Sequence, residues 1–274
     1  MKTPNLISAL LAIALLAALM QIGAFAAPLT TAAPAAEVTV YVTIANATVK
    51  LAHAPVTVKD TDGDGTLTIN DALTLAHDAH FEGGAAAGYA SAASEWGLSL
   101  TRLWGVENGG SYGYYLNNKS AMGLADPVAD GDSIYAFVYT DTVGFSDSYC
   151  YFDKNTLTAA AGESITITLT SAGYDANWQP VTAPMAGAAI TVDGKETEIV
   201  TDAEGRATLT LTEGEHVIGA VHGEKNITPP VCVATVTAAQ SPATGDTAVI
   251  YICLLALAMV GAGAGLARRK TDVA

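Results

Sequence analysis

Short runs of alternating apolar and β-branched residues, separated by clusters of Gly, Asn and Asp, dominate the chain between residues 37 and 237. Such alternation places every second side chain on one face of a strand, and the turn residues mark where strands end. One segment breaks the pattern, because residues 70–81 carry apolar side chains at helical spacing and are followed by Gly83-Gly84, a helix stop. The sequence therefore predicts a mainly β fold with one main helix.

The expected strands form two groups. The first group surrounds the helix and predicts an α+β domain over residues 37–154, whereas the second contains no helical segment and predicts a small all-β sandwich over residues 158–237. We expect strands of the first domain at 38–44, 56–58, 98–103, 112–116, 133–139 and 149–152, and strands of the second at 164–169, 188–192, 198–200, 206–212, 216–221 and 231–236.

Both ends of the chain are apolar and are set apart from any core. Residues 1–26 combine one lysine, an apolar stretch and the small-x-small pattern Ala24-Phe25-Ala26, which predicts a signal peptide removed after Ala26, with an uncleaved anchor as the alternative. Residues 27–36, rich in Ala, Pro and Thr, predict a flexible stalk. Residues 247–267 carry no charge and are long enough to cross a bilayer as a helix. The basic residues that follow predict a cytoplasmic tail over 268–274 and place the rest of the chain outside.

A short motif precedes this apolar span within a linker over 238–246. It reads Ser241-Pro242-Ala243-Thr244-Gly245, and the order of pentapeptide, apolar helix and basic tail resembles the Leu-Pro-x-Thr-Gly sorting signal of Gram-positive surface proteins. The resemblance implies cleavage by a sortase after Thr244 and transfer to peptidoglycan. Ser241 stands where that family has Leu, so a plain membrane anchor is the alternative.

The most complete ligand pattern lies between the second expected strand and the helix. Carboxylates recur at alternate positions of a twelve-residue EF-hand-type loop, with Gly65 at position 6 and an acidic residue at position 12. A hard cation needs six or more oxygens, and alternate carboxylates converge only where glycine bends the turn. The pattern predicts a calcium site formed by Asp60, Asp62, Asp64, the carbonyl of Thr66, and Asp71. The alternative is an acidic turn in which Asp71 caps the helix.

Three segments resemble known families. Leu67-Thr68-Ile69-Asn70-Asp71-Ala72-Leu73 resembles the calcium loop and helix of dockerins, which implies docking to a cohesin, although dockerins carry two such repeats and this chain carries one. Residues 110–118 with 128–137 resemble the domain related to the cobalamin-capping β-domain of transcobalamin, which implies capture of a corrinoid or another small ligand. Residues 186–192 and 213–218 with Thr201-Asp202-Ala203-Glu204-Gly205 resemble the immunoglobulin-like repeats of bacterial surface proteins, which implies a spacer with a hairpin turn at Asp202.

Other side chains leave alternatives open. Cys150 and Cys232 lie in the expected exported part and form either a disulfide or two buried thiols. His77 and His80 are i and i+3 on the helix and either share a metal or are ordinary helix histidines. The aromatic residues of two expected strands form either a ligand-binding face or part of the core; these are Tyr112, Tyr114, Tyr115, Tyr135, Phe137 and Tyr139.

Charge and motif content limit the function classes. The formal net charge of −15 disfavours binding of nucleic acid, which requires basic patches. The sequence carries no nucleophile motif, phosphate-binding loop or triad order, so we expect no enzyme activity. We expect a cell-surface-anchored, calcium-stabilised binding or adhesion protein whose extracellular ligand is unknown, with sortase, peptidoglycan and the membrane as partners.

Three alternatives differ in what they require. Small-ligand capture requires a concave aromatic face, a dockerin-like assembly module requires a second calcium loop, and a glycan-acting enzyme requires paired carboxylates across a cleft.

Overall fold

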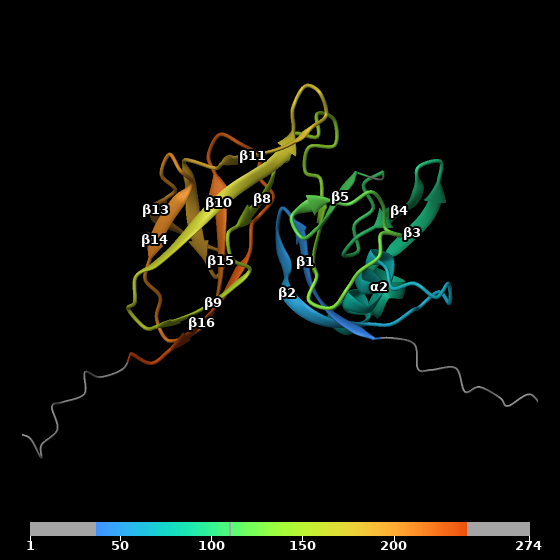
Figure 1. The fold of residues 1–274 in the computed structure, drawn as a ribbon, viewed down its shortest axis with the longest axis horizontal. Coiled ribbons are helices and arrows are strands. Elements are labelled where there is room, and N and C mark those ends of the chain that lie inside the picture. The colour runs from blue at the N-terminus through green and yellow to red at the C-terminus, as the bar shows by residue number, and fades with distance from the viewer. Residues whose placement is uncertain (1–36, 110, 240–274) are drawn as a thin grey trace, which may run out of the picture. The chain divides into compact units, whose positions relative to one another are not determined.

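The computed structural model describes residues 37–109 and 111–239, which belong to one compact unit (Figure 1). The described chain is mainly β, in agreement with the alternation in the sequence. The expected signal peptide, stalk, sorting motif (residues 241–245) and apolar span (residues 247–267) lie outside the described residues. None of the helices within the described ranges has the length and apolar character needed to cross a membrane.

A five-stranded sheet forms the first half of the fold, in the order β2-β1-β7-β5-β6. The sheet is mixed. Strand β1 pairs with β7 in parallel fashion and with β2 in antiparallel fashion. The alternating residues of β7 belong to two different cores: Ile134, Ala136 and Val138 pack in one, and Tyr135 and Phe137 pack in another. The strands are β1 (Val38–Asn46), β2 (Thr48–Val58), β5 (Tyr112–Leu116), β6 (Lys119–Ser120) and β7 (Ser133–Val138).

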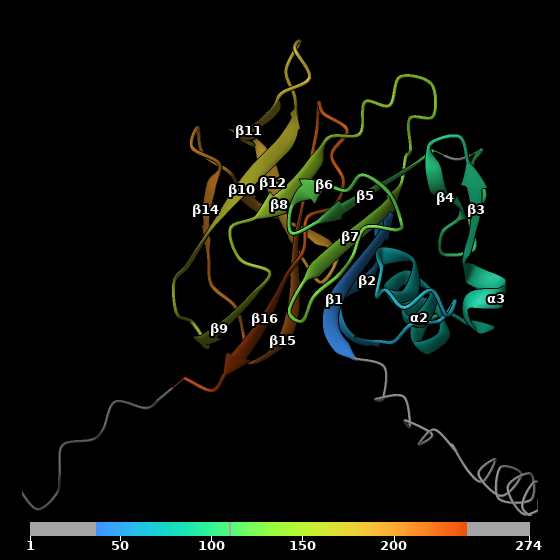
Figure 2. The same ribbon diagram turned by 45° about the vertical axis from the view of Figure 1, so that its right-hand side comes forward.

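Helix α2 (Ile69–His80) packs against β1 and β2, as Figures 1 and 2 both show. Its buried residues, including Ile69, Leu73 and Ala76, join the first core together with Val42 and Ile44 of β1. The short helix α3 (Gly84–Gly88) and the two-stranded hairpin of β3 (Ala90–Ser94) and β4 (Gly97–Arg102) follow it. The loop that enters α2 is therefore held between a sheet strand and a buried helix.

Two sheets that share one core make up the second half. One contains β11-β10-β14 with β8 also paired to β10, and the other has the order β13-β12-β15-β16-β9. This agrees with the expected all-β sandwich. The strands are β8 (Tyr149–Phe152), β9 (Thr156–Ala160), β10 (Ile165–Tyr174), β11 (Pro180–Pro184), β12 (Ala188–Val192), β13 (Lys195–Val200), β14 (Arg206–Leu209), β15 (Gly214–His222) and β16 (Cys232–Thr237).

Strand β8 differs from the sequence-based assignment, which grouped it with the first domain. Phe152 pairs with Leu169 of β10, and Cys150 and Phe152 are buried in the core of the sandwich. The reason lies in the alternation of the strand: Cys150 and Phe152 enter the sandwich core, whereas Tyr149 packs with the aromatic residues of β7. One strand therefore contributes to two cores.

The sequence predicts a hairpin turn at Asp202; the structure contains a turn there, but it links β13 to β14, which lie in different sheets, so it is not a hairpin. Oδ1 of Asp202 accepts hydrogen bonds from the backbone N–H groups of Glu204 (3.0 Å) and Arg206 (2.8 Å). Gly205 has a φ of 76°, and a Cβ at this position would lie 2.4 Å from the carbonyl oxygen of Leu169. Only glycine therefore fits this turn.

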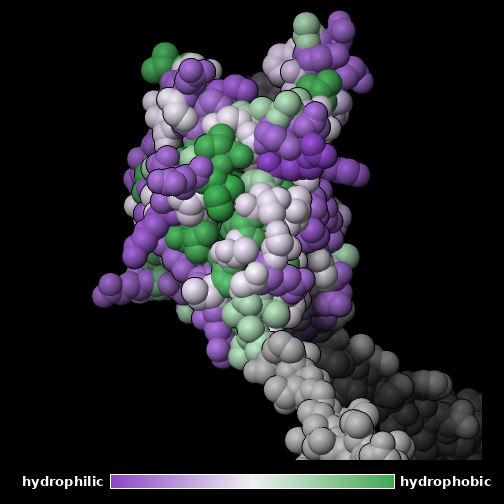
Figure 3. Space-filling view, turned by 90° about the vertical axis from the view of Figure 1, so that its left-hand side faces the viewer, coloured by the Kyte–Doolittle hydropathy of each residue, from purple (hydrophilic) through white to green (hydrophobic). Residues whose placement is uncertain are grey.

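Figure 3, which views the molecule from the side of β13 and β14, shows apolar side chains gathered in a band among polar ones.

Candidate metal centre

The loop before α2 is folded over the carboxylate of Asp60. The N–H of Gly63 donates to its Oδ1 (2.6 Å), and the N–H of Gly65 donates to its Oδ2 (2.8 Å). Both glycines have positive φ values, 80° and 88°, which residues with a side chain rarely adopt. The glycine that the pattern requires at position 6 thus makes the bend and donates a hydrogen bond as well.

Two further turns follow in the same loop. Oδ1 of Asp62 accepts from the N–H of Asp64 (3.2 Å), and Oδ1 of Asp64 accepts from the N–H of Thr66 (2.7 Å). Aspartate side chains commonly stabilise turns in this way by bonding to the backbone two residues on. Each of these carboxylates retains free lone pairs, because a carboxylate has about four acceptor positions.

Asp71 lies in the first turn of α2 and is fully buried. Its Oδ2 accepts from the N–H (3.0 Å) and the hydroxyl (2.7 Å) of Thr68, whose hydroxyl in turn accepts from the N–H of Asp71. This reciprocal pair is a capping box. Its Oδ1 accepts from the N–H of Thr61 (2.9 Å) and from the Thr61 hydroxyl. The helix-capping alternative for Asp71 is therefore realised in the structure.

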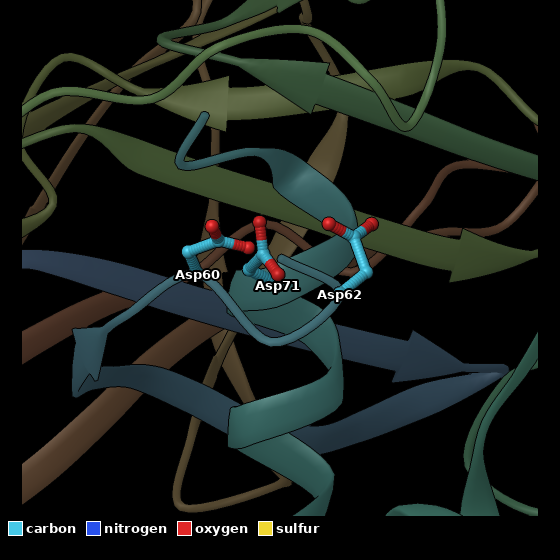
Figure 4. A group of neighbouring side chains, drawn as sticks. All are labelled: Asp60, Asp62 and Asp71. Carbon is cyan, nitrogen blue, oxygen red and sulfur yellow. The ribbon is translucent and has the colours of Figure 1, made fainter. Parts of the chain in front are cut away.

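Three of the predicted ligands converge. Asp60, Asp62 and Asp71 each offer a carboxylate oxygen, and these oxygens all lie within 4.8 Å of one another. Figure 4 shows Asp60 and Asp62 on the loop and Asp71 at the start of the helix. Asp64 stands outside this group and is exposed, as is Thr66, whose predicted contribution is a backbone carbonyl. The arrangement presents a partly exposed set of oxygen ligands, which is the kind that calcium prefers.

The two loop carboxylates differ in their electrostatics. The N–H groups of Gly65 and Gly63 hold the pKa of Asp60 below its ordinary value. For Asp62, the N–H of Asp64 favours the charged form, but desolvation and the charges of Asp64, Asp71 and Asp60 outweigh it and raise the pKa. The net repulsion at Asp62 is one that a bound cation would relieve.

Of two interactions at this site, the sequence predicts one and not the other. The capping role of Thr68 follows from the Thr-x-x-Asp spacing, which is a weaker form of the usual capping-box pattern. The contact between Thr61 and Asp71 has no such signal, because it depends on how the loop folds back onto the helix. Asn70, next to Asp71, is held by the hydroxyls of Tyr89 (2.8 Å) and Ser91 (2.9 Å).

The helix histidines do not face one metal position. His77 is buried, its Nδ1 donates to the carbonyl of Leu73 (2.6 Å), and its Nε2 accepts from the N–H of Trp104 (3.1 Å). Desolvation by burial lowers the pKa of His77, which favours the neutral ring that this pair of bonds requires. His80 is exposed. His77 therefore acts as a core residue whose two ring nitrogens are both engaged.

Most of the aromatic residues serve packing. The ring centroids of Tyr115 and Tyr149 lie 3.6 Å apart, and the hydroxyl of Tyr135 donates to the carbonyl of Pro229 (2.6 Å). The hydroxyl of Tyr112 lies 2.9 Å from the carbonyl oxygen of Thr101 and 2.8 Å from that of Val106, and its single proton bonds to these two acceptors. A third hydrophobic cluster, formed by Ala45, Tyr115, Tyr135, Phe137, Tyr139, Tyr149 and Tyr151 with Ala172, thus joins the first sheet to the sandwich.

Both described cysteines are free thiols in the structure. Cys150 and Cys232 are buried in the sandwich core, and burial raises the pKa of each thiol to about 12. Thiols with so little thiolate character are unreactive. Of the two alternatives that the sequence left open, the structure contains the two buried thiols.

Comparisons with known proteins give little further information. No protein-family model and no curated protein matches the chain. Among solved structures, the chain is similar to the N-terminal four immunoglobulin domains of Dscam1 isoforms 6.9 and 9.44, with 12% identity and TM-scores of 0.21 and 0.20. Each match covers 39% of this chain and 23% of the other, so the chain spans less than a quarter of these structures. The fold described above rests on its own strand pairings.

Proposed function

We propose that this protein is a calcium-stabilised, non-catalytic binding or adhesion module held at the cell surface. The observation that carries the calcium part is the convergence of Asp60, Asp62 and Asp71 within 4.8 Å at the start of a buried helix. A cation at this point would link the loop to the helix and to the sheet beneath it, so its binding energy would add to the stability of the fold.

The charge balance of the loop supports a cation over a structural role alone. Among the described residues, the five salt bridges all involve other carboxylates, so no cationic side chain neutralises this group. The donors that do meet these carboxylates are backbone N–H groups and threonine hydroxyls. Oxygen ligands without nitrogen or sulfur favour calcium or magnesium over zinc. The irregular and exposed loop favours calcium, which tolerates flexible geometry.

The surface location rests on the ends of the chain. The signal-like residues 1–26, the motif at 241–245 and the apolar span at 247–267 support export followed by attachment to peptidoglycan through a sortase, or by retention in the membrane. The binding or adhesion role follows from a β-rich module displayed in this way without a catalytic motif.

The test is thermal unfolding in calcium and in chelator. At a calcium concentration 100-fold above Kd, binding adds about 2.7 kcal/mol to the free energy of unfolding. For a unit of this size we expect Tm to rise by roughly 5–10 °C. The variant Asp62→Asn should lose most of this rise. Asp175→Asn is the matched control, because Asp175 is also an exposed aspartate whose Oδ1 accepts from backbone N–H groups of its own turn.

Two results would contradict the proposal. Equal Tm values in calcium and in chelator would mean that the loop is a helix-capping turn and does not bind calcium. An equal loss of the calcium response in Asp62→Asn and Asp175→Asn would place the ion elsewhere. Replacing calcium by magnesium at the same concentration tests selectivity, and we expect a smaller rise because magnesium demands near-ideal octahedral geometry.

A further inference from the structure

A cleft of about 690 Å³ lies between the β5–β6 turn and the β10–β11 hairpin. This volume falls within the range of about 300–1,000 Å³ that is typical of small-molecule sites. Tyr115, Tyr151 and Tyr174 line it, and Met122 lies at its edge with its side chain exposed. The concave aromatic face that small-ligand capture requires is therefore present, although most of the aromatic residues expected to form it are used in packing.

The tyrosines of the cleft are held at different depths. Tyr115 is stacked on Tyr149 and belongs to the third hydrophobic cluster, as does Tyr151, so both form a rigid floor. Tyr174, at the end of β10, is 49% exposed, and its ring centroid lies 6.2 Å from that of Trp178, which is 81% exposed. Large aromatic side chains left open to solvent beside a concavity are typical of a binding surface.

Polar groups stand at the rim. Oδ1 of Asn118 accepts from the hydroxyl of Tyr149 (2.8 Å), which orients the amide, and within the described chain its Nδ2 has no protein acceptor. Lys119, also in the lining, has an exposed ammonium that makes no salt bridge with a described carboxylate. The lining contains no Asp or Glu, although the whole chain has 27 acidic residues against 12 basic ones.

This composition narrows the ligand class. A nucleotide or another multiply charged anion would need more than one cation, and a purely apolar ligand would make no use of the amide and the ammonium at the rim. An added peptide strand is disfavoured, because the neighbouring edge strand β11 begins and ends with proline, which has no N–H to donate. The class of ligand that fits best has an apolar face, many hydroxyl groups and at most a single negative charge.

We propose that this cleft binds a carbohydrate. A sugar ring stacks its C–H face on Tyr174, and its hydroxyls accept hydrogen bonds from Asn118 and Lys119. A single carboxylate on the sugar would be accommodated by Lys119. The inference rests on the proposed binding role and names its ligand class, but it does not depend on calcium.

The experiment probes the full chain with an array of immobilised oligosaccharides, both neutral and uronic-acid-containing, followed by calorimetric titration of the best binder. We expect Tyr174→Ala to raise Kd about tenfold, since the stacking of one aromatic ring contributes up to about that factor. Ser120→Trp should abolish binding by filling the cleft from an exposed lining position. Trp96→Ala is the matched control, because Trp96 is 84% exposed on the β3–β4 hairpin and lies outside the lining.

The outcomes separate this inference from the calcium proposal. Each variant is also melted in calcium and in chelator. A Tm in chelator equal to that of the wild type confirms that the variant is folded, and the calcium response is measured separately. The carbohydrate assignment is overturned if no oligosaccharide binds, or if Trp96→Ala weakens binding as much as Tyr174→Ala does. In each of these cases the calcium response of the wild type stands unaffected.

Discussion

Replacing Asp71 by alanine tests whether one carboxylate both holds the helix and binds a cation. The buried side chain accepts hydrogen bonds from the backbone and hydroxyl groups of Thr61 and Thr68. Loss of the capping interaction costs about 1 kcal/mol. Leaving buried donors unsatisfied adds about 1–3 kcal/mol. We therefore expect Asp71→Ala to lower the free energy of unfolding by about 3 kcal/mol even in chelator.

This loss corresponds to a fall in Tm of about 6–12 °C for a unit of this size. The measurement is urea unfolding and differential scanning calorimetry in chelator, repeated in calcium. Asp64→Ala is the control, because Asp64 lies in the same loop, is exposed and accepts only from Thr66. A cost below about 1 kcal/mol in chelator would refute the capping role. A calcium-induced rise in Tm that survives in Asp71→Ala would refute the role of this carboxylate as a ligand.

The remaining predictions concern the cores. Tyr135→Phe removes the buried hydrogen bond to the carbonyl of Pro229, and we expect urea unfolding to show that the free energy of unfolding falls by about 1–3 kcal/mol. An unchanged free energy of unfolding would mean that this contact between the two halves is not formed in solution. Burial lowers the pKa of His77, so the contribution of the neutral ring to stability is present above the unfolded-state pKa of about 6.5 and is lost as pH falls. His77→Gln should therefore flatten the decline in the free energy of unfolding between pH 7.5 and 5.5. An unchanged decline would contradict this. Cys150 and Cys232, each with its pKa raised to about 12, should react with an alkylating reagent at pH 8 only after unfolding, as mass spectrometry of the peptides that contain them would reveal.

Much of the strand pattern could be predicted from the sequence, because apolar and β-branched residues alternate where one face is buried. The expected segments 112–116, 149–152 and 188–192 coincide with β5, β8 and β12. Four strands were missed, namely β3, β6, β9 and β11. Strand β3 consists of Ala and Ser, and β11 is fully exposed and bounded by prolines. Neither carries the apolar alternation on which strand prediction depends.

Pairing partners were less predictable than the strands themselves. The alternation of β8 indicates a strand but does not say which sheet receives it, and its pairing with β10 depends on where Cys150 and Phe152 find a core. The same holds for the aromatic residues. Their spacing identifies two faces, but only the fold reveals that Tyr135 and Phe137 pack in a cluster between the first sheet and the sandwich, and that Tyr174 of a distant strand completes the open cleft.

For the acidic loop, the spacing of carboxylates and glycine predicted the bend and three members of the group, because such a turn is determined locally, but it did not predict that Asp64 stands outside. Asp60 and Asp62 lie near Asp71 as expected, and Gly65 makes the bend. The sequence did not distinguish a helix cap from a metal ligand at Asp71, since both uses need a carboxylate in the first helical turn. The structure contains the cap, and calcium binding stays a prediction.

The parallel pairing of β1 with β7 has a consequence for the order in which the chain folds. Tyr41 lies opposite Ser133, so β1 can pair with β7 only after about ninety further residues have been synthesised. Until then, one edge of the β1–β2 hairpin has unpaired backbone groups, a hazard for association with other chains. Pairing between segments so far apart raises the contact order and slows folding. The second half has the same property, since β9 pairs in parallel with the last strand, β16. The first sheet is therefore completed only when β7, which ends at Val138, has been synthesised, and the sheet of β9 and β16 only when synthesis has reached Thr237.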